Sequence, residues 1–194
     1  MAAPAQRPKI GVVALQGCVE PHLRHLRAAG ADARAVRTAA EIAQSDALIL
    51  PGGESGAWLR LLAYAELFEP LRAAAADRPI WGICAGAILL AREVQAPQTS
   101  LGSIDIVVAR NAYGRQLDSW SAEVDGYEVA FIRAPRVVQC GTAVQVEARH
   151  AGDPVFVREG LRWATTFHPE LGASAPSPFH ARFAALAATS ARVS

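Results

Sequence analysis

The first half of the chain alternates short apolar runs with segments in which apolar residues recur at helical spacing. The short runs predict strands at residues 9–15, 33–37 and 47–50 and at Ile80 and Trp81. The helical spacing predicts one helix that ends near Gly30, one that ends near Pro70, and one over residues 71–76. Strands that alternate with helices predict a mostly parallel sheet with helices on both faces and ligands beyond the carboxyl ends of its strands.

The second half of the chain changes to short β-like runs separated by turns. These runs lie at residues 104–109, 123–124, 129–132, 137–139, 144–149, 155–158 and 163–167. We interpret them as antiparallel strands, some forming an extension and some returning to the main sheet, before a closing helix at 180–188. Because no repeat or interdomain linker is evident, we expect a disordered lead at residues 1–8 and a single domain at residues 9–190.

The segment Gly82-Ile83-Cys84-Ala85-Gly86 joins a predicted strand to a run of alanine, isoleucine and leucine. Its G-x-C-x-G spacing is that of a nucleophile elbow, in which a strand turns sharply into a helix with the reactive side chain at the apex. A helix N-terminus beside the sulfur favours thiolate over thiol. Cys84 is thus a candidate nucleophile; the alternative is a small buried cysteine in an ordinary turn.

His168 and Glu170 could supply the partners that a cysteine nucleophile needs. Pro169 between them favours extended geometry at His168, which would direct both side chains to the same side. A thiolate that attacks an amide needs a base to move the proton and a carboxylate to orient that base. A plain turn at residues 168–170 is the alternative interpretation.

An oxyanion hole would need two backbone N–H groups close to the nucleophile. Ala85, the residue after Cys84, is one candidate donor, and Gly53 in the loop after the third predicted strand is the other. Taken alone, the Gly52-Gly53 pair is equally typical of a tight turn at a strand end.

Composition narrows the class of function. The 194 residues carry 19 Lys and Arg against 18 Asp and Glu, a balance that does not favour a nucleic-acid surface. The three cysteines and five histidines form no ligand pattern, so we expect no disulfide, metal site or cofactor. His22 and His25 could share a helix face, which we interpret as solvated. No apolar run approaches a signal peptide or the ~20 residues of a membrane span, so we expect a cytoplasmic protein.

Six short motifs occur in the order and near the spacing of one family. They are QG at 16–17, PGGES at 51–55, GICAG at 82–86, RNAYGRQ at 110–116, FIRAP at 131–135 and HPEL at 168–171. From about residue 9 to 171 the chain resembles the glutaminase subunit of pyridoxal 5′-phosphate synthase, a class I (triad) glutamine amidotransferase. The resemblance implies an α/β, flavodoxin-like three-layer sandwich with a mostly parallel central sheet and a small antiparallel extension.

The resemblance also implies a reaction. Cys84, His168 and Glu170 would hydrolyse L-glutamine to L-glutamate and ammonia. The ammonia would pass through a channel to the synthase (lyase) subunit of a large heteromeric complex, for vitamin B6 synthesis. The residues that match the family's glutamine-binding set are Gly52, Gly53, Glu54, Arg110, Ile132 and Arg133. Gln16 matches a family residue close to the active site and the partner interface, and the family enzyme is poorly active until the synthase docks.

The sequence departs from the family at Cys18, Pro21 and Gly56 and in residues 172–183, none of which is a triad position. Three alternatives stay open. The chain could serve another amidotransferase, it could be a peptidase or γ-glutamyl hydrolase, or it could be a non-catalytic redox sensor or chaperone. A sensor would oxidise Cys84 without depending on His168.

Overall fold

The computed structural model describes residues 7–110 and 119–191, so most of the expected lead at residues 1–8 and most of the motif at 110–116 lie outside it. The main sheet has seven strands. They are β1 (Lys9–Val13), β2 (Asp32–Val36), β3 (Ala47–Leu50), β4 (Ile80–Ile83), β10 (Gln145–His150), β11 (Asp153–Glu159) and β12 (Arg162–Thr165). Their order is β10-β11-β12-β4-β3-β1-β2. The run β2-β1-β3-β4-β12 is parallel throughout, which is the flavodoxin-like order, and β10 and β11 extend it in antiparallel pairs.

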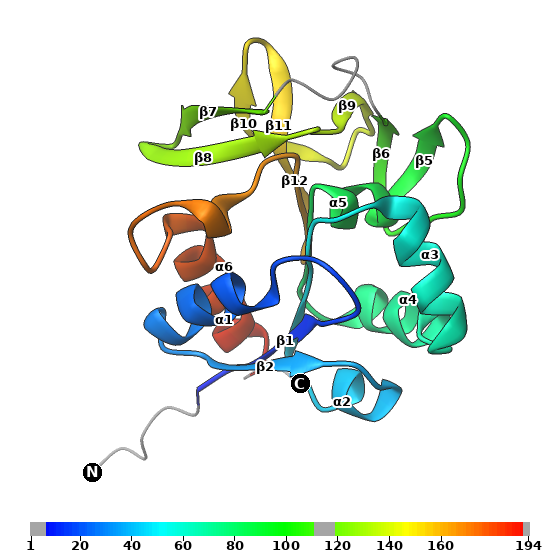
Figure 1. The fold of residues 1–194 in the computed structure, drawn as a ribbon, viewed down its shortest axis with the longest axis vertical. Coiled ribbons are helices and arrows are strands. Elements are labelled where there is room, and N and C mark those ends of the chain that lie inside the picture. Colours follow the sequence, from blue (N-terminus) through cyan, green and yellow to red (C-terminus); the bar gives the residue numbers. More distant parts are fainter. Residues whose placement is uncertain (1–6, 111–118, 192–194) are drawn as a thin grey trace.

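Helices cover both faces of this sheet. They are α1 (Val19–Ala28), α2 (Ala39–Ala43), α3 (Ser55–Tyr64), α4 (Phe68–Asp77), α5 (Ala85–Leu90) and α6 (Pro178–Ser190). In Figure 1 the sheet is seen nearly edge-on, with α1 and α6 on one side and α3, α4 and α5 on the other. Alternate strand residues point to opposite faces, so Leu48 and Leu50 join the core under α3 to α5, while Ile49 joins the core under α1 and α6. The predicted three-layer fold is confirmed.

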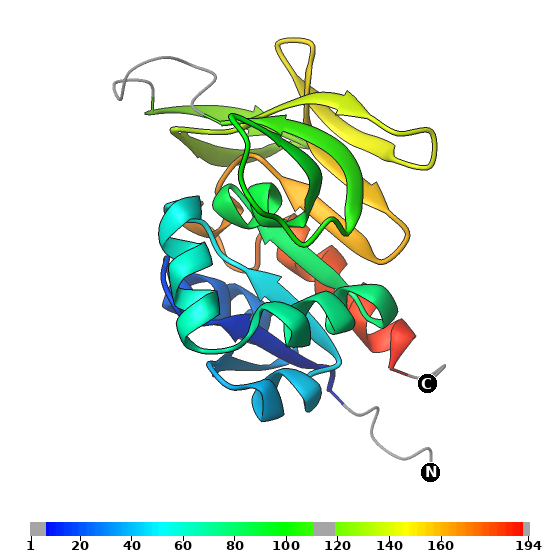
Figure 2. The ribbon, with the colours of Figure 1, turned by 90° about the vertical axis from the view of Figure 1, so that its right-hand side faces the viewer.

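Two small sheets form the extension. One contains β5 (Ala91–Gln95), β6 (Ile104–Ala109) and β9 (Arg136–Cys140), and the other is the hairpin of β7 (Ser119–Val124) and β8 (Tyr127–Ile132). Figures 1 and 2 show both, together with β10 and β11, gathered at the end of the main sheet where α5 begins. This end carries the loops that we expected to converge.

One prediction for the second half was wrong in part, and one strand was missed. The strand predicted at 163–167 was expected to be antiparallel; β12 does pair antiparallel with β11, but on its other side it pairs in parallel with β4. β5 was not predicted at all, because its first residue continues the apolar run of α5, and a continuous apolar run does not distinguish helix from strand. β6 accordingly pairs in parallel with β5 on one side and antiparallel with β9 on the other.

Among the helices in residues 7–110 and 119–191, none combines the length and the apolar character needed to cross a membrane.

Candidate active site

The predicted elbow is present at the end of β4. Cys84 caps the N-terminus of α5 with a φ of 52° and a ψ of −103°, a conformation that is strained for a residue with a side chain. Two glycines permit it. A Cβ on Gly82 would overlap the carbonyl of Gly86, and a Cβ on Gly86 would overlap the carbonyl of Leu50. The turn therefore holds Cys84 at its apex, where the residue is 6% exposed.

His168 and Glu170 lie together below the sulfur. His168 Nδ1 is 2.7 Å from Glu170 Oε1, and the two residues are 8% and 1% exposed. The backbone of His168 is extended, as predicted, and its N–H donates to the carbonyl of Ala130 in β8 at 2.7 Å. The next three residues, Pro169–Leu171, form a 3-10 turn (η1) instead of continuing the extended chain. The turn, and not the strand alternation that we expected, brings the carboxylate under the imidazole.

The surroundings favour charge on His168 and Glu170. Burial alone would lower the pKa of His168, but hydrogen bonds and negative charge from Cys84 and Glu170 raise it to about 10. Burial alone would raise the pKa of Glu170, but its contacts with His22 and His168 lower it. Cys84 and Glu170 thus favour the protonated form of His168, which can deliver that proton to a leaving group.

The loops after β1 and β3 meet the elbow, as predicted. A Cβ on Gly52 would overlap the ring of His168. Gly53 has a φ of 137° and lies against Gln16, which would be 2.9 Å from a Cβ at that position. Gln16 Nε2 donates to the carbonyl of Glu54 at 2.7 Å, and the Glu54 N–H donates to Gln16 Oε1 at 3.4 Å. The side chain of Gln16 therefore binds both the N–H and the carbonyl of Glu54, the residue that follows Gly53.

A small pocket of about 60 Å³ opens beside the sulfur. It is lined by Gly53, Glu54, Ser55, Cys84, Ile88, Arg110, Ile132, Arg133 and Pro135. The structure thus brings every predicted glutamine-binding residue except Gly52 to one pocket, and Gly52 packs behind it against His168.

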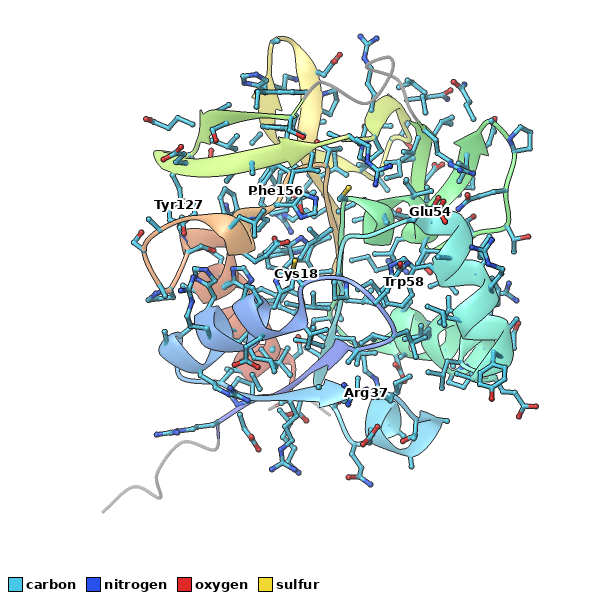
Figure 3. The ribbon with its side chains drawn as sticks, viewed as in Figure 1. Cys18, Arg37, Glu54, Trp58, Tyr127 and Phe156 are labelled. Atoms are coloured by element: carbon cyan, nitrogen blue, oxygen red, sulfur yellow. The ribbon has the colours of Figure 1, made fainter. Side chains whose placement is uncertain are left out.

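Opposite charges lie on one side of the pocket. Glu54, at the first turn of α3 in Figure 3, accepts from the N–H of Gly56 at 2.9 Å and of Ala57 at 2.6 Å. The hydrogen bond from Gly56 is the largest influence that lowers the pKa of Glu54. Arg110 Nη2 lies 3.9 Å from Glu54 Oε1. The pair presents a carboxylate and a guanidinium next to the nucleophile.

Sequence reasoning missed Gln98, in the loop between β5 and β6. Its Oε1 accepts hydrogen bonds from Ser55 Oγ at 3.0 Å and from Arg110 Nη1. Gln98 therefore fixes the guanidinium that the pocket presents. Because β5 was not predicted, nothing in the sequence placed this loop beside α3.

The interpretation of His22 and His25 as a solvated pair was also wrong. Both are fully buried, together with His180 of α6. Their helix face packs against α6 and η1, elements that lie more than a hundred residues further along the chain. Within the described residues no group of His, Cys, Asp or Glu is arranged to hold a metal ion.

The fold is a doubly wound sheet, and Cys84, His168 and Glu170 meet at the carboxyl ends of its parallel strands. Residues 12–184 match the SNO glutamine amidotransferase family, and the chain belongs to that family. The pyridoxal 5′-phosphate synthase subunit PdxT of Frankia casuarinae is 54% identical over 175 aligned positions, and the match covers 84% of this chain and 88% of that protein. PdxT of Acidothermus cellulolyticus is 49% identical over 209 aligned positions and covers 100% of both chains.

A crystal structure of a glutamine amidotransferase is similar to this chain with a TM-score of 0.83 and 38% identity, covering 92% of this chain and 98% of the other. These comparisons confirm the family and the fold class that the sequence motifs predicted.

Proposed function

We propose that this chain is the glutaminase subunit of a pyridoxal 5′-phosphate synthase and that Cys84, His168 and Glu170 form its catalytic triad. The observation that carries the proposal is the elbow cysteine next to a histidine whose Nδ1 is 2.7 Å from a buried carboxylate, beside a pocket that presents opposite charges. Free L-glutamine has both charges at its α-carbon and an amide at the far end.

The triad accounts for both halves of the hydrolysis. With the proton of the Cys84 thiol held on His168, Sγ attacks the side-chain amide carbon, the C–S bond forms, and the carbonyl π electron pair moves to the oxygen. His168 gives its proton to the amide nitrogen, so the C–N bond breaks and ammonia leaves. His168 then takes a proton from water, which attacks the thioester, and L-glutamate is released as the C–S bond breaks. Glu170 orients the imidazole throughout.

The oxyanion that forms in each half needs donors in place. The backbone N–H groups of Ala85, at the start of α5, and of Gly53 are the proposed donors. The first N–H groups of a helix have no partner within the helix, so the N–H of Ala85 is suited to this role.

The pocket explains selection of a free amino acid. Arg110 would pair with the α-carboxylate of glutamine and Glu54 with its α-ammonium group. Ile132 and Arg133 line the pocket and would present backbone groups to the rest of the substrate. Gly52 would act indirectly, because the ring of His168 occupies the space that a Cβ would need there. A peptide-bonded glutamine lacks both charges, so the pocket favours the free amino acid over a protein substrate.

The names of the relatives support a synthase partner for this chain. We propose that the partner receives the ammonia and that it acts on the glutaminase through Gln16. Gln16 holds Glu54 by two hydrogen bonds, immediately after Gly53. A partner that moved Gln16 would therefore reset the orientation of the Gly53 N–H, so activity would depend on docking.

Glutamate release from L-glutamine tests the proposal, with the protein alone and then mixed with a pyridoxal 5′-phosphate synthase partner subunit. We expect a low rate that rises on mixing and is abolished in Cys84→Ala. Cys18→Ala and Cys140→Ala are the matched controls and should keep the wild-type rate. A rate unaffected by mixing would contradict the partner, and an active Cys84→Ala would contradict the triad.

A further inference from the structure

Three fully buried histidines lie behind the triad carboxylate, and the reaction as derived above uses none of them. His22 and His25 come from α1, and His180 comes from α6. His22 Nδ1 is 2.9 Å from His180 Nε2, and His22 Nε2 is 3.6 Å from Glu170 Oε1. The cluster therefore joins two helices to the far side of the carboxylate that His168 contacts.

Ser177 sets the direction of the hydrogen bonds in this cluster. Its Oγ accepts from the backbone N–H of His180 at 3.2 Å and lies 2.6 Å from His180 Nδ1. Among the described residues, the hydrogen bonds offer the hydroxyl proton no other acceptor than Nδ1, so the proton of His180 is on Nε2. His180 then donates to His22 Nδ1, which leaves the proton of His22 on Nε2, facing Glu170.

The opposite direction of these hydrogen bonds is electrostatically unfavourable. It would put the proton of His22 on Nδ1 and direct the Nε2 lone pair at a carboxylate. It would also require the Ser177 hydroxyl oxygen to accept from both the backbone N–H and the Nδ1–H of His180. The hydroxyl proton of Ser177 would then have no acceptor among the described residues.

His25 holds the same turn at its backbone. The N–H of Ser177 donates to His25 Nδ1 at 3.0 Å, so His25 carries its proton on Nε2, which donates to the carbonyl of Glu170 at 3.2 Å. Arg24 Nη2 lies 3.5 Å from the same Nε2, but both nitrogens carry protons, so no hydrogen bond forms between them. Ser177 thus sets the tautomers of His180 and His25 together.

The three rings are neutral at ordinary pH. Burial lowers the pKa of His22 to about 4, against the attraction of Glu170 and with the repulsion of His168 and His25. Burial also lowers the pKa of His25, assisted by Arg24, and that of His180. A neutral ring carries one proton, so the tautomer that Ser177 sets at His180 determines the tautomer of His22 and leaves the Nε2–H of His22 facing Glu170.

We propose that His22 is a positioning residue of the triad: its Nε2–H faces Glu170 Oε1 and fixes the carboxylate in the orientation that accepts from His168, with Ser177 and His180 setting its tautomer. Among the described residues, neither His22 Nε2 nor Glu170 Oε2 has a partner within hydrogen-bond distance, so the 3.6 Å contact with Glu170 Oε1 is an electrostatic one between the facing N–H and the carboxylate. The catalytic consequence rests on the function proposed above.

Three substitutions of His22 separate positioning from packing. The amide nitrogen of His22→Gln can replace Nε2, that of His22→Asn replaces Nδ1 instead, and His22→Leu removes both. We expect His22→Leu and His22→Asn to lower kcat for glutamine about 10- to 100-fold with KM unchanged, because a small displacement of a catalytic group is costly. The acid limb of the pH profile should move to higher pH in both, since Glu170 loses the N–H dipole that faces it. His22→Gln should recover most of the rate.

Leu26→Ala, a fully buried position on the same helix that takes no part in these hydrogen bonds, is the packing control. It should lose stability but keep the wild-type kcat and pH profile. Equal kcat losses in all three His22 variants and Leu26→Ala would overturn the positioning role, as would a wild-type pH profile in His22→Leu.

Nitrogen-15 NMR of the histidine rings in the wild-type protein tests the hydrogen-bond direction without any assay. We expect neutral Nε2–H tautomers for His22, His25 and His180 between pH 6 and 8. An Nδ1–H tautomer at His22 would overturn the proposal even if glutamine is hydrolysed. A wild-type protein without glutaminase activity but with the expected tautomers would contradict the proposed function and leave the hydrogen-bond direction standing.

Discussion

Cys84 combines the side chain of the proposed nucleophile with a backbone conformation that few residues other than glycine adopt. Its φ of 52° sets the turn from β4 into α5, and the absence of a Cβ at Gly82 and Gly86 lets the chain close at this turn. Strain of this kind costs on the order of 1–3 kcal/mol and persists because the surrounding core fixes the turn. The conformational strain of the elbow is thus located at Cys84, so substitutions of this residue can measure it.

Replacing Cys84 with glycine should give a more stable protein than replacing it with alanine. Both variants remove the sulfur, but glycine relieves the positive φ, which outweighs its loss of chain entropy by about 1 kcal/mol. Urea unfolding measures the difference. The matched pair is Cys140→Gly and Cys140→Ala, in strand β9, where alanine should be the more stable. Alanine equal to or better than glycine at residue 84 would show that the elbow is not strained.

At the scale of elements, the packing of α1 against α6 makes stability depend on pH. His22, His25 and His180 are buried between them, and each has a pKa below its ordinary value. In the unfolded chain these three histidines bind protons near pH 6.5, whereas in the folded protein they do so only at lower pH. Their contribution to the free energy of unfolding is therefore fully present above pH 6.5 and is lost as the pH falls toward the folded pKa values.

His22 alone should contribute about 3 kcal/mol of this loss between pH 6.5 and 4, from a shift of about 2.5 pKa units. We expect the free energy of unfolding to be clearly smaller at pH 5 than at pH 7.5. His22→Gln, which cannot titrate, should show a shallower dependence. His168 has the opposite sign, since its raised pKa gives stability below pH 6.5 that is lost as the pH rises through about 10. A pH-independent stability between 5 and 7.5 would contradict the buried neutral histidines.

Much of the element order could be predicted from the sequence, because local signals determine it. The run at 47–50 coincides with β3, and the glycine spacing around Cys84 predicts the elbow. What could not be predicted depends on contacts between distant segments. The parallel pairing of β12 with β4, the strand β5, and the burial of His22 against His180 are not expressed in any local pattern.

At the scale of the whole molecule, the site exists because separate parts of the chain meet at one end of the main sheet. The loops after β1, β3 and β4 bring Gln16, Gly53 and Cys84 together, as the parallel strand order predicts. The extension completes the site: β8 holds the backbone of His168, and the carbonyl of Ile132 lies 3.9 Å from Cys84 Sγ. The sequence predicts this hairpin but not that it lies over the nucleophile.

The most direct test of the central claim is the site of covalent reaction with a diazoketone analogue of L-glutamine, read by peptide mass spectrometry. The chain has three cysteines, of which Cys18 is exposed, Cys140 is half-buried and Cys84 is buried. A glutaminase triad predicts a single adduct on Cys84, slowed by excess L-glutamine and lost in His168→Asn. Modification of the more exposed Cys18 in preference, or an adduct that L-glutamine does not slow, would contradict the account.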